Sequence, residues 1–179
     1  SEGDTSLDIN NKYNVKSENV FIDRKKQIIY GNDKATIVDK ENNIIQLLDK
    51  FTFNFNTEII KSRNAFILDK NENKYFFEDL IVNLKSNEII GKELKLNFKK
   101  TYFGNEKNDP LLKGRSSYSN EKELKVYKAV FSTCNIENKK CRGWELITDE
   151  FRHDKVNKLF EYKNSWLKIF DYKIFYLPK

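Results

Sequence analysis

Apolar and polar residues alternate with a period of two along most of this chain. Phenylalanine occupies every second position of residues 51–55, and the same alternation runs through residues 80–84 and 94–98. Successive side chains of a β-strand point to opposite faces of its sheet, so this period predicts strands with one buried and one exposed face. Ile, Phe, Tyr and Val, which are frequent in these segments, also favour strands. The alternation therefore predicts an all-β fold.

The predicted strands recur about every fifteen residues. Apolar pairs open the first five units at positions 28, 44, 59, 75 and 89, which are 16, 15, 16 and 14 residues apart. Polar clusters rich in Asn and Asp, such as residues 39–43 and 69–74, separate the units and are typical of turns. Later segments fit the same period from Leu111, Val126, Trp144, Leu159 and Ile174. This self-similarity predicts an extended array of stacked units.

Each unit is longer than an ordinary strand. About eleven residues between turns would span roughly 36 Å if straight, whereas a typical strand has about five or six residues. Polar or glycine breaks lie near the middle of most units, at residues 30–33, 61–64, 78–79 and 91–93. Such breaks predict bends that send the two halves of a unit to different sheets. We therefore expect a bent two-sheet β-jelly roll over residues 20–179, preceded by a flexible segment at residues 1–19.

The alternating apolar residues define the inner faces of the two expected sheets. They are Ala35, Ile37, Phe51, Phe53, Phe55, Ile67, Leu80, Val82, Leu84, Leu94, Leu96 and Phe98. The two faces either pack together as an ordinary core or splay apart and line an apolar groove, and periodicity does not separate these arrangements. An array of this kind also leaves unpaired strands at its ends. We expect such an edge at Val20, Ile22, Ile28 and Ile29.

Charge and the scarce residue types narrow the possible chemistry. The chain has 33 Lys+Arg against 27 Asp+Glu, a net charge of +6 that favours an anionic partner. The lysines are spread evenly, so the charge does not predict specific nucleic-acid binding. No apolar run approaches the roughly 18 residues of a membrane helix, and residues 1–4 show no signal peptide. An already removed secretory signal remains compatible with this sequence.

Residues suited to catalysis are few. The single histidine, His153, lies in a polar, turn-like stretch and is expected at the surface, and one His with two Cys does not complete a zinc site without carboxylates. Glycine-rich phosphate-binding motifs and a nucleophile elbow are missing from the sequence. A nucleophilic pair of Cys134 or Cys141 with His153 is formally possible. We expect no enzyme activity, no metal and no cofactor.

Two blocks of the sequence resemble a known family. The segment Ile29–Asp39, echoed at residues 65–69, resembles the OstA-like family of lipopolysaccharide-transport proteins. Residues 127–134, followed by residues 144–147 and 152–154, are similar to a Cys- and Trp-containing stretch of the LptD branch, which assembles lipopolysaccharide in the outer membrane. Residues 164–169 and 174–178 look like the linker before the membrane barrel of that branch. Lys173 stands where the branch commonly has Pro or Val.

The resemblance implies an OstA-like β-jelly roll, or β-taco, in the periplasm, as part of an outer-membrane protein. Such a domain accepts lipopolysaccharide in an apolar groove and passes it to the protein's own membrane β-barrel, which would follow residue 179. The implied partners are lipopolysaccharide, an LptA-like bridging protein at the N-terminal strand edge, and the barrel with its LptE-like lipoprotein plug; nucleic acid is not among them.

The resemblance also bears on the two cysteines. Cys134 matches the family cysteine that bonds to the barrel, whereas the family's usual N-terminal cysteine has no counterpart in residues 1–133. Cys141 either replaces that missing partner or pairs locally with Cys134. A disulfide that involves Cys134 and Cys141 is therefore expected, with its partners left open.

Two other functions remain as alternatives. A free-standing OstA-like bridge would lack the Cys/Trp block and the Tyr-x-Pro ending at residues 176–178. A basic all-β module that binds nucleic acid or polysaccharide would place aromatic and Lys side chains together on an outer face.

Overall fold

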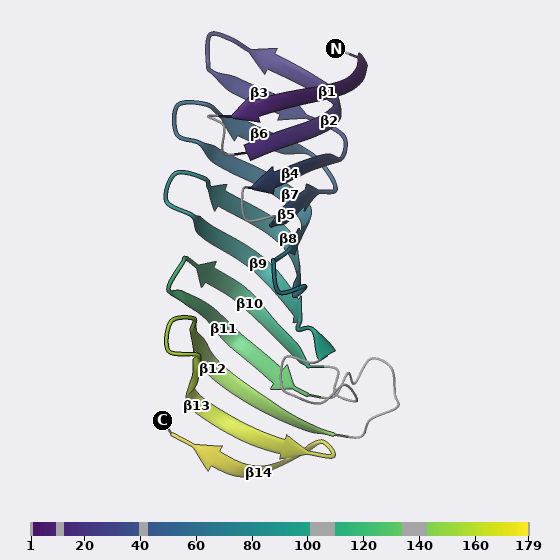
Figure 1. The fold of residues 1–179 in the computed structure, drawn as a ribbon. Coiled ribbons are helices and arrows are strands. Elements are labelled where there is room, and N and C mark those ends of the chain that lie inside the picture. Colours follow the sequence, from purple (N-terminus) through teal and green to yellow (C-terminus); the bar gives the residue numbers. More distant parts are fainter. Residues whose placement is uncertain (1, 10–12, 40–42, 101–109, 134–142, 179) are drawn as a thin grey trace.

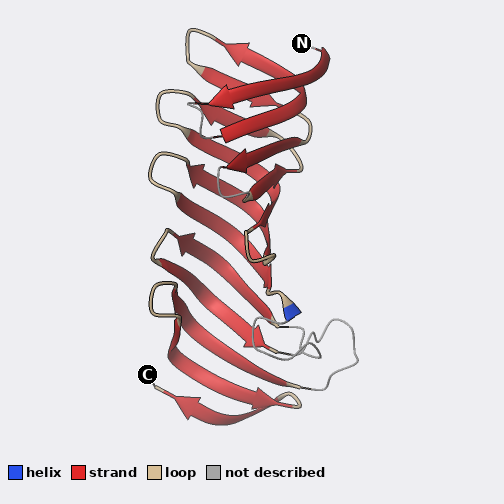
Figure 2. Ribbon diagram, in the orientation of Figure 1, coloured by secondary structure: helices blue, strands red, loops and turns tan. Residues whose placement is uncertain are grey.

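The computed structural model describes residues 2–9, 13–39, 43–100, 110–133 and 143–178 (Figure 1). These residues form strands joined by turns, which confirms the all-β prediction (Figure 2). The strands are β1 (Glu2–Ile9), β2 (Tyr13–Asp23), β3 (Ile28–Gly31), β4 (Ala35–Asp39), β5 (Ile44–Leu47), β6 (Phe51–Asn54), β7 (Ile59–Leu68), β8 (Lys74–Asn83), β9 (Glu88–Asn97), β10 (Leu111–Ser119), β11 (Glu123–Ser132), β12 (Trp144–Asp154), β13 (Leu159–Ile169) and β14 (Tyr172–Leu177). Ten strands, β3, β5 and β7 to β14, begin within three residues of a predicted unit start, while β4 and β6 begin in the middle of a unit. The described part of the chain contains no apolar helix of membrane-spanning length.

All fourteen strands belong to one open antiparallel sheet. Its order is β14-β13-β12-β11-β10-β9-β8-β7-β5-β4-β2-β3-β6, with β1 beside β2 and a further pairing between β6 and β7. Figure 1 shows the strands stacked along one long axis, with the two chain ends at opposite ends of the stack. The sheet is thus an elongated array, as the repeat predicts.

The sheet divides into two limbs that share the long strands. The two halves of β2 and of β7 pair with different short strands. In β2, residues 20–23 pair with β3 and residues 13–17 pair with β4. In β7, residues 59–62 pair with β6 and residues 65–68 pair with β5. We call the β3–β6 side limb A; it continues through residues 79–83, 88–92, 116–119, 123–127, 150–154 and 159–163. Limb B is the β4–β5 side, which continues through residues 74–77, 94–97, 111–114, 129–132, 144–148, 165–169 and β14.

A residue with a positive φ angle marks the border between the limbs in every second long strand. These residues are Asn64, Glu93, Lys128 and Asn164, with φ angles of 47°, 48°, 51° and 52°. Strand pairing skips each of them together with one residue of the neighbouring strand, so the register is kept. The skipped position reverses the alternation of faces, and Ser62 and Ala65, three positions apart, are therefore both buried. The same face of the sheet is thus buried in both limbs.

Limb A ends in a series of similar turns. Asp23, Asn54, Asn83 and Asp154 each close a strand, and each side-chain Oδ1 accepts the backbone N–H groups two and three residues later at 2.9–3.2 Å. The last residue of each turn has a positive φ angle, between 53° and 55°. Asn and Asp make such side-chain bonds readily, which explains their recurrence between the units.

The N-terminal segment differs from the expectation of a flexible region over residues 1–19. Residues 2–9 form β1, which pairs with β2 from Ile9↔Tyr13 to Glu2↔Asn19. Polar side chains such as Lys16 and Asp8 interrupt the apolar alternation here, so the pattern did not indicate a strand. The described sheet therefore begins at Glu2.

Candidate functional site

The inner face of the sheet, defined by its buried side chains, carries apolar rows that cross from strand to strand. The limb B row consists, in order of direct cross-strand pairing, of Val15, Ile37, Ile45, Ile67, Tyr75, Leu96, Leu112, Phe131, Leu146, Leu167 and Phe175. The limb A row consists of Ile29, Phe53, Ile60, Val82, Ile89, Ser119, Leu124, His153 and Phe160. Each row is continuous over almost the whole array.

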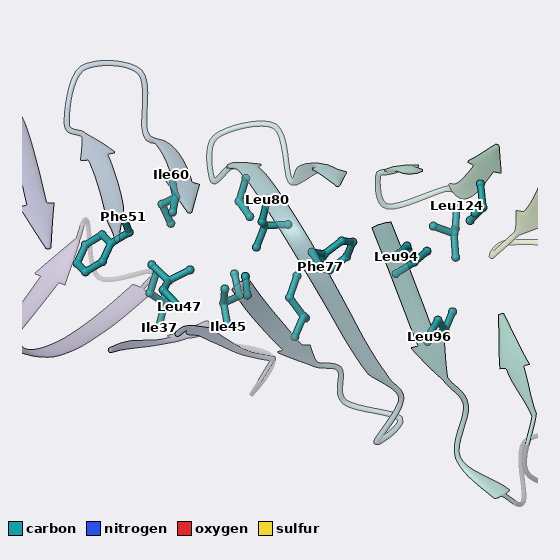
Figure 3. Close-up of a cluster of buried hydrophobic side chains, with 14 of the residues drawn as sticks. Ile37, Ile45, Leu47, Phe51, Ile60, Phe77, Leu80, Leu94, Leu96 and Leu124 are labelled. Carbon is teal, nitrogen blue, oxygen red and sulfur yellow. The ribbon is translucent and has the colours of Figure 1, made fainter. Parts of the chain in front are cut away.

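The structure brings the predicted groove residues together. Eleven of the twelve are buried, and Phe55 packs against them, its ring centroid 5.1 Å from that of Phe53. Figure 3 shows residues of both limbs, among them Phe51 and Ile37, pointing into a shared space. In this structure the predicted groove residues therefore form a packed core.

Close contacts across the bends hold the two limbs together. Phe131 of limb B stacks on Phe151 of limb A with ring centroids 6.1 Å apart. A Cβ atom added to Gly91 of limb A would lie 2.2 Å from Cδ1 of Phe77 in limb B. Only a residue without a side chain fits under that ring. The middle of the array is thus tightly closed.

The inner face opens at the C-terminal end. Phe160, Tyr162 and Leu167 of β13 are half-buried, and Phe175 of β14 is 57% exposed. β14 pairs with residues 165–169 of β13, so it covers limb B alone. These residues continue the rows of the predicted groove, and the sequence analysis did not select them although they follow the same alternation. Nothing local in a sequence distinguishes a last strand from an inner one.

Three titratable side chains line this opening in limb A. His153, expected at the surface, is instead half-buried on the inner face, with its ring centroid 4.6 Å from that of Phe160. Burial lowers the pKa of His153, an effect that Lys155 adds to and Asp154 opposes. Burial also lowers the pKa of Lys155, opposed by the Asp69 carboxylate, and raises the pKa of Tyr162.

The residues of the predicted partner edge lie in two different settings. Phe21 and Ile22 of β2 are 68% and 46% exposed, and β1 accompanies β2 only as far as Asn19. Ile28 and Ile29, however, do not lie at an edge, because β3 is hydrogen-bonded between β2 and β6. The pairing of β3 with β6 joins residues 20 to 26 positions apart, which a local pattern does not reveal. Val20, like Ile22, belongs to the part of β2 that pairs with β3.

The predicted disulfide residues, Cys134 and Cys141, lie outside the described residues. Within the described ranges, no cluster of three or more His, Cys, Asp or Glu side chains is arranged to hold a metal ion. No protein-family model and no curated protein matches this sequence. The apolar inner face, with its open C-terminal end, is therefore the feature of the molecule that bears on function.

Proposed function

We propose that this chain is an OstA-like lipid-transport domain of the LptD type, a bent two-sheet β-jelly roll that handles lipopolysaccharide in the periplasm. The observation that carries the proposal is the continuous inner row of limb B, which is apolar from Val15 in β2 to Phe175 in β14 and changes from closed to open along the chain. An acyl chain bound on such a face removes apolar surface from water, which stabilises the complex by about 25 cal/mol per Å².

Passage of a lipid requires the two limbs to separate locally. The limbs are joined covalently at the bends and otherwise meet through apolar side chains such as Phe131 and Phe151. Acyl chains can replace these contacts with contacts of the same chemistry, so the exchange has a small net free-energy cost. No bond is made or broken, so the domain acts by binding and not as an enzyme.

The two ends of the array supply the partner surfaces that this function needs. At the N-terminal end, β1 and the exposed residues Phe21 and Ile22 offer a strand edge to which an LptA-like bridging protein can add a strand. At the C-terminal end, the exposed apolar strand β14 would face the protein's own membrane β-barrel and its LptE-like plug. Lipopolysaccharide would then travel from β1 toward β14.

Photo-crosslinking at the open end tests the proposal. A photoreactive phenylalanine analogue replaces Phe175, which pairs with Leu167 on the inner face, or Tyr176, which pairs with Trp166 on the outer face. The two positions are adjacent and similarly exposed, at 57% and 42%. We expect lipopolysaccharide adducts at position 175 and few at position 176. Equal adducts at both positions, or none at 175, would contradict the proposal.

One observation favours a second function, binding of an anionic polysaccharide or nucleic acid on the outer face. In limb B an outer row joins Phe66, Phe76, Lys95, Lys113, Val130, Ile147, Trp166 and Tyr176 by direct pairing. Phe66 stacks on Phe76 and Trp166 on Tyr176, both with ring centroids 5.0 Å apart, and Lys173 lies 5.3 Å from the Trp166 ring. Aromatic rings beside cations are typical of such surfaces.

Heparin binding separates the two functions. If the outer row binds polyanions, Phe76→Ala and Trp166→Ala should each weaken heparin binding, while adducts at position 175 stay unchanged. Heparin binding that is independent of both substitutions would exclude this second function.

A further inference from the structure

Lys155 is a half-buried cation without an ion-pair partner among the described residues. Its Nζ donates hydrogen bonds to Ser119 Oγ at 2.8 Å and to the backbone carbonyl of Asn120 at 2.6 Å, both neutral acceptors. By contrast, ion pairs such as Lys128 with Asp149 and Lys92 with Asp79 lie on exposed surface. A buried charge is unfavourable unless an opposite charge compensates it. Lys155 is thus placed where an anion would stabilise it.

The Lys155 ammonium group lies at the turn end of limb A, beside Ser119 of the inner row. Ser119, which accepts its hydrogen bond, belongs to the inner row between Ile89 and Leu124. His153, two residues before Lys155, belongs to the same row and lies against Phe160. The limb A row is apolar as far as Ile89, and beyond it Ser119 and His153 alternate with Leu124 and Phe160. The Lys155 ammonium group therefore lies beside a polar position of the inner row, at the turn end of limb A.

The opening gives access from the C-terminal end. No described strand follows β13 in limb A, because β14 pairs with β13 from Ser165 onward. Phe160, the last residue of the limb A inner row, is only half-buried. An amphiphile can therefore lay its chains along β13 and β14 while its polar group reaches Lys155.

One carboxylate acts on Lys155 from a distance without forming an ion pair with it. Asp69, on the rim of limb B, acts on Lys155 electrostatically, yet its oxygens accept hydrogen bonds from its own turn. Those donors are the backbone N–H groups of Asn71 and Asn73, the Asn73 side-chain amide and the Tyr75 hydroxyl, at 2.8–3.1 Å. A phosphate group at Lys155 would form a charge-assisted hydrogen bond that Asp69 does not provide.

We propose that Lys155, flanked by His153 and Ser119, binds the phosphate monoester of an amphiphile whose acyl chains lie on the inner face of β13 and β14. This site deepens the proposed function and rests on it. Free phosphate carries the same chemistry but lacks the chains, so the two sources predict different behaviour.

Binding of lipid A and of dephosphorylated lipid A to the chain tests this site. The wild type should bind lipid A roughly tenfold more tightly, which corresponds to about 1.4 kcal/mol. Lys155→Gln should bring this ratio close to one without weakening the binding of dephosphorylated lipid A, and Lys155→Arg should keep the preference. Lys122→Gln, on the exposed adjacent turn, is the matched control and should behave as the wild type. Because the ratio compares two ligands of one variant, a change in stability alone does not alter it.

Each of the other outcomes rejects the site. Equal affinity of the wild type for the two lipids would reject the phosphate site and leave the proposed function standing. Failure to bind either lipid would reject the proposed function and this site with it. A preference that survives in Lys155→Gln would place the phosphate elsewhere. Inorganic phosphate that binds at Lys155 without reducing lipid A binding would identify a site for free anions, and the lipid headgroup proposal would fail.

Discussion

The closed middle of the array and its open C-terminal end are built from the same strand pattern. Leu96 in β9 and Phe175 in β14 lie in one inner row, yet Leu96 is fully buried and Phe175 is 57% exposed. Leu96 has strands on both sides and the opposite limb across from it, whereas β14 is the last strand and limb A ends at β13. Burial in this fold therefore depends on the number of covering neighbours rather than on the alternation itself. The same side-chain chemistry serves as core in one place and as accessible surface in the other.

The largest difference between the two regions should appear in stability. Leu96→Ala removes a fully buried side chain, so we expect it to lower the free energy of unfolding by about 2–5 kcal/mol. Phe175→Ala removes a larger but exposed side chain and should change it by less than about 0.5 kcal/mol. Urea denaturation followed by circular dichroism measures both. A loss for Phe175→Ala as large as that for Leu96→Ala would show that the end is closed in solution.

A smaller effect is expected at the border between the two regions, where Thr148 of β12 pairs with Ser165 of β13. Both side chains are buried, but Thr148 Oγ1 lies 2.8 Å from the carbonyl oxygens of Glu150 and Lys163, while Ser165 Oγ has no hydrogen-bond partner among the described residues. Thr148→Val should lower the free energy of unfolding by about 1–3 kcal/mol, because it leaves buried backbone groups without a partner. Ser165→Ala should leave stability unchanged or raise it.

The same denaturation experiment compares these two variants. If Ser165→Ala is as destabilising as Thr148→Val, Ser165 Oγ is hydrogen-bonded in solution. That result would place water inside this part of the inner face, and the open region would then extend to β12.

The sequence predicts the strands and their inner residues well because both depend on local pattern. The unit starts at Ile44, Ile59 and Trp144 are also the first residues of β5, β7 and β12. The polar breaks also mark the bends, since Asn64 and Glu93 lie within them and have positive φ angles. A break near the middle of a long unit is a physical requirement of the bend, so it is visible in composition.

Features that depend on distant pairing could not be predicted in the same way. Ile29 belongs to the first unit of the array and is therefore predicted at its edge, but β6 covers the other side of β3. His153 looked exposed because its neighbours in sequence are charged, yet its cross-strand neighbours Leu124 and Phe160 place it on the inner face. Whether a strand with alternating apolar and polar residues lies in the middle of the sheet or at its end likewise depends on the whole sheet.

The smallest predicted effect concerns the ion pairs that connect the open end to the closed middle on the outer face of limb A. Glu123 of β11 accepts a 2.7 Å hydrogen bond from Arg152 of β12, which also contacts Glu161 of β13 at 2.8 Å. Lys125 lies 2.7 Å from Glu123 as well. Hydrogen bonds from Lys125 and then Arg152 lower the pKa of Glu123 below its usual value of 4.5.

A carboxyl group whose pKa is lowered by folding adds stability above its unfolded pKa, and this contribution is lost as the pH falls through the folded pKa. Glu123→Gln should therefore lower stability at pH 7, by less than about 1 kcal/mol because the pair is near the surface, and should have less effect near pH 3. Urea midpoints at the two pH values measure the difference. Glu93→Gln is the control, since Glu93 is exposed at a bend and forms no ion pair among the described residues. If Glu123→Gln changes the midpoint equally at both pH values, the ion pair does not connect the open end to the middle, and β13 is held by backbone pairing and inner-face contacts alone.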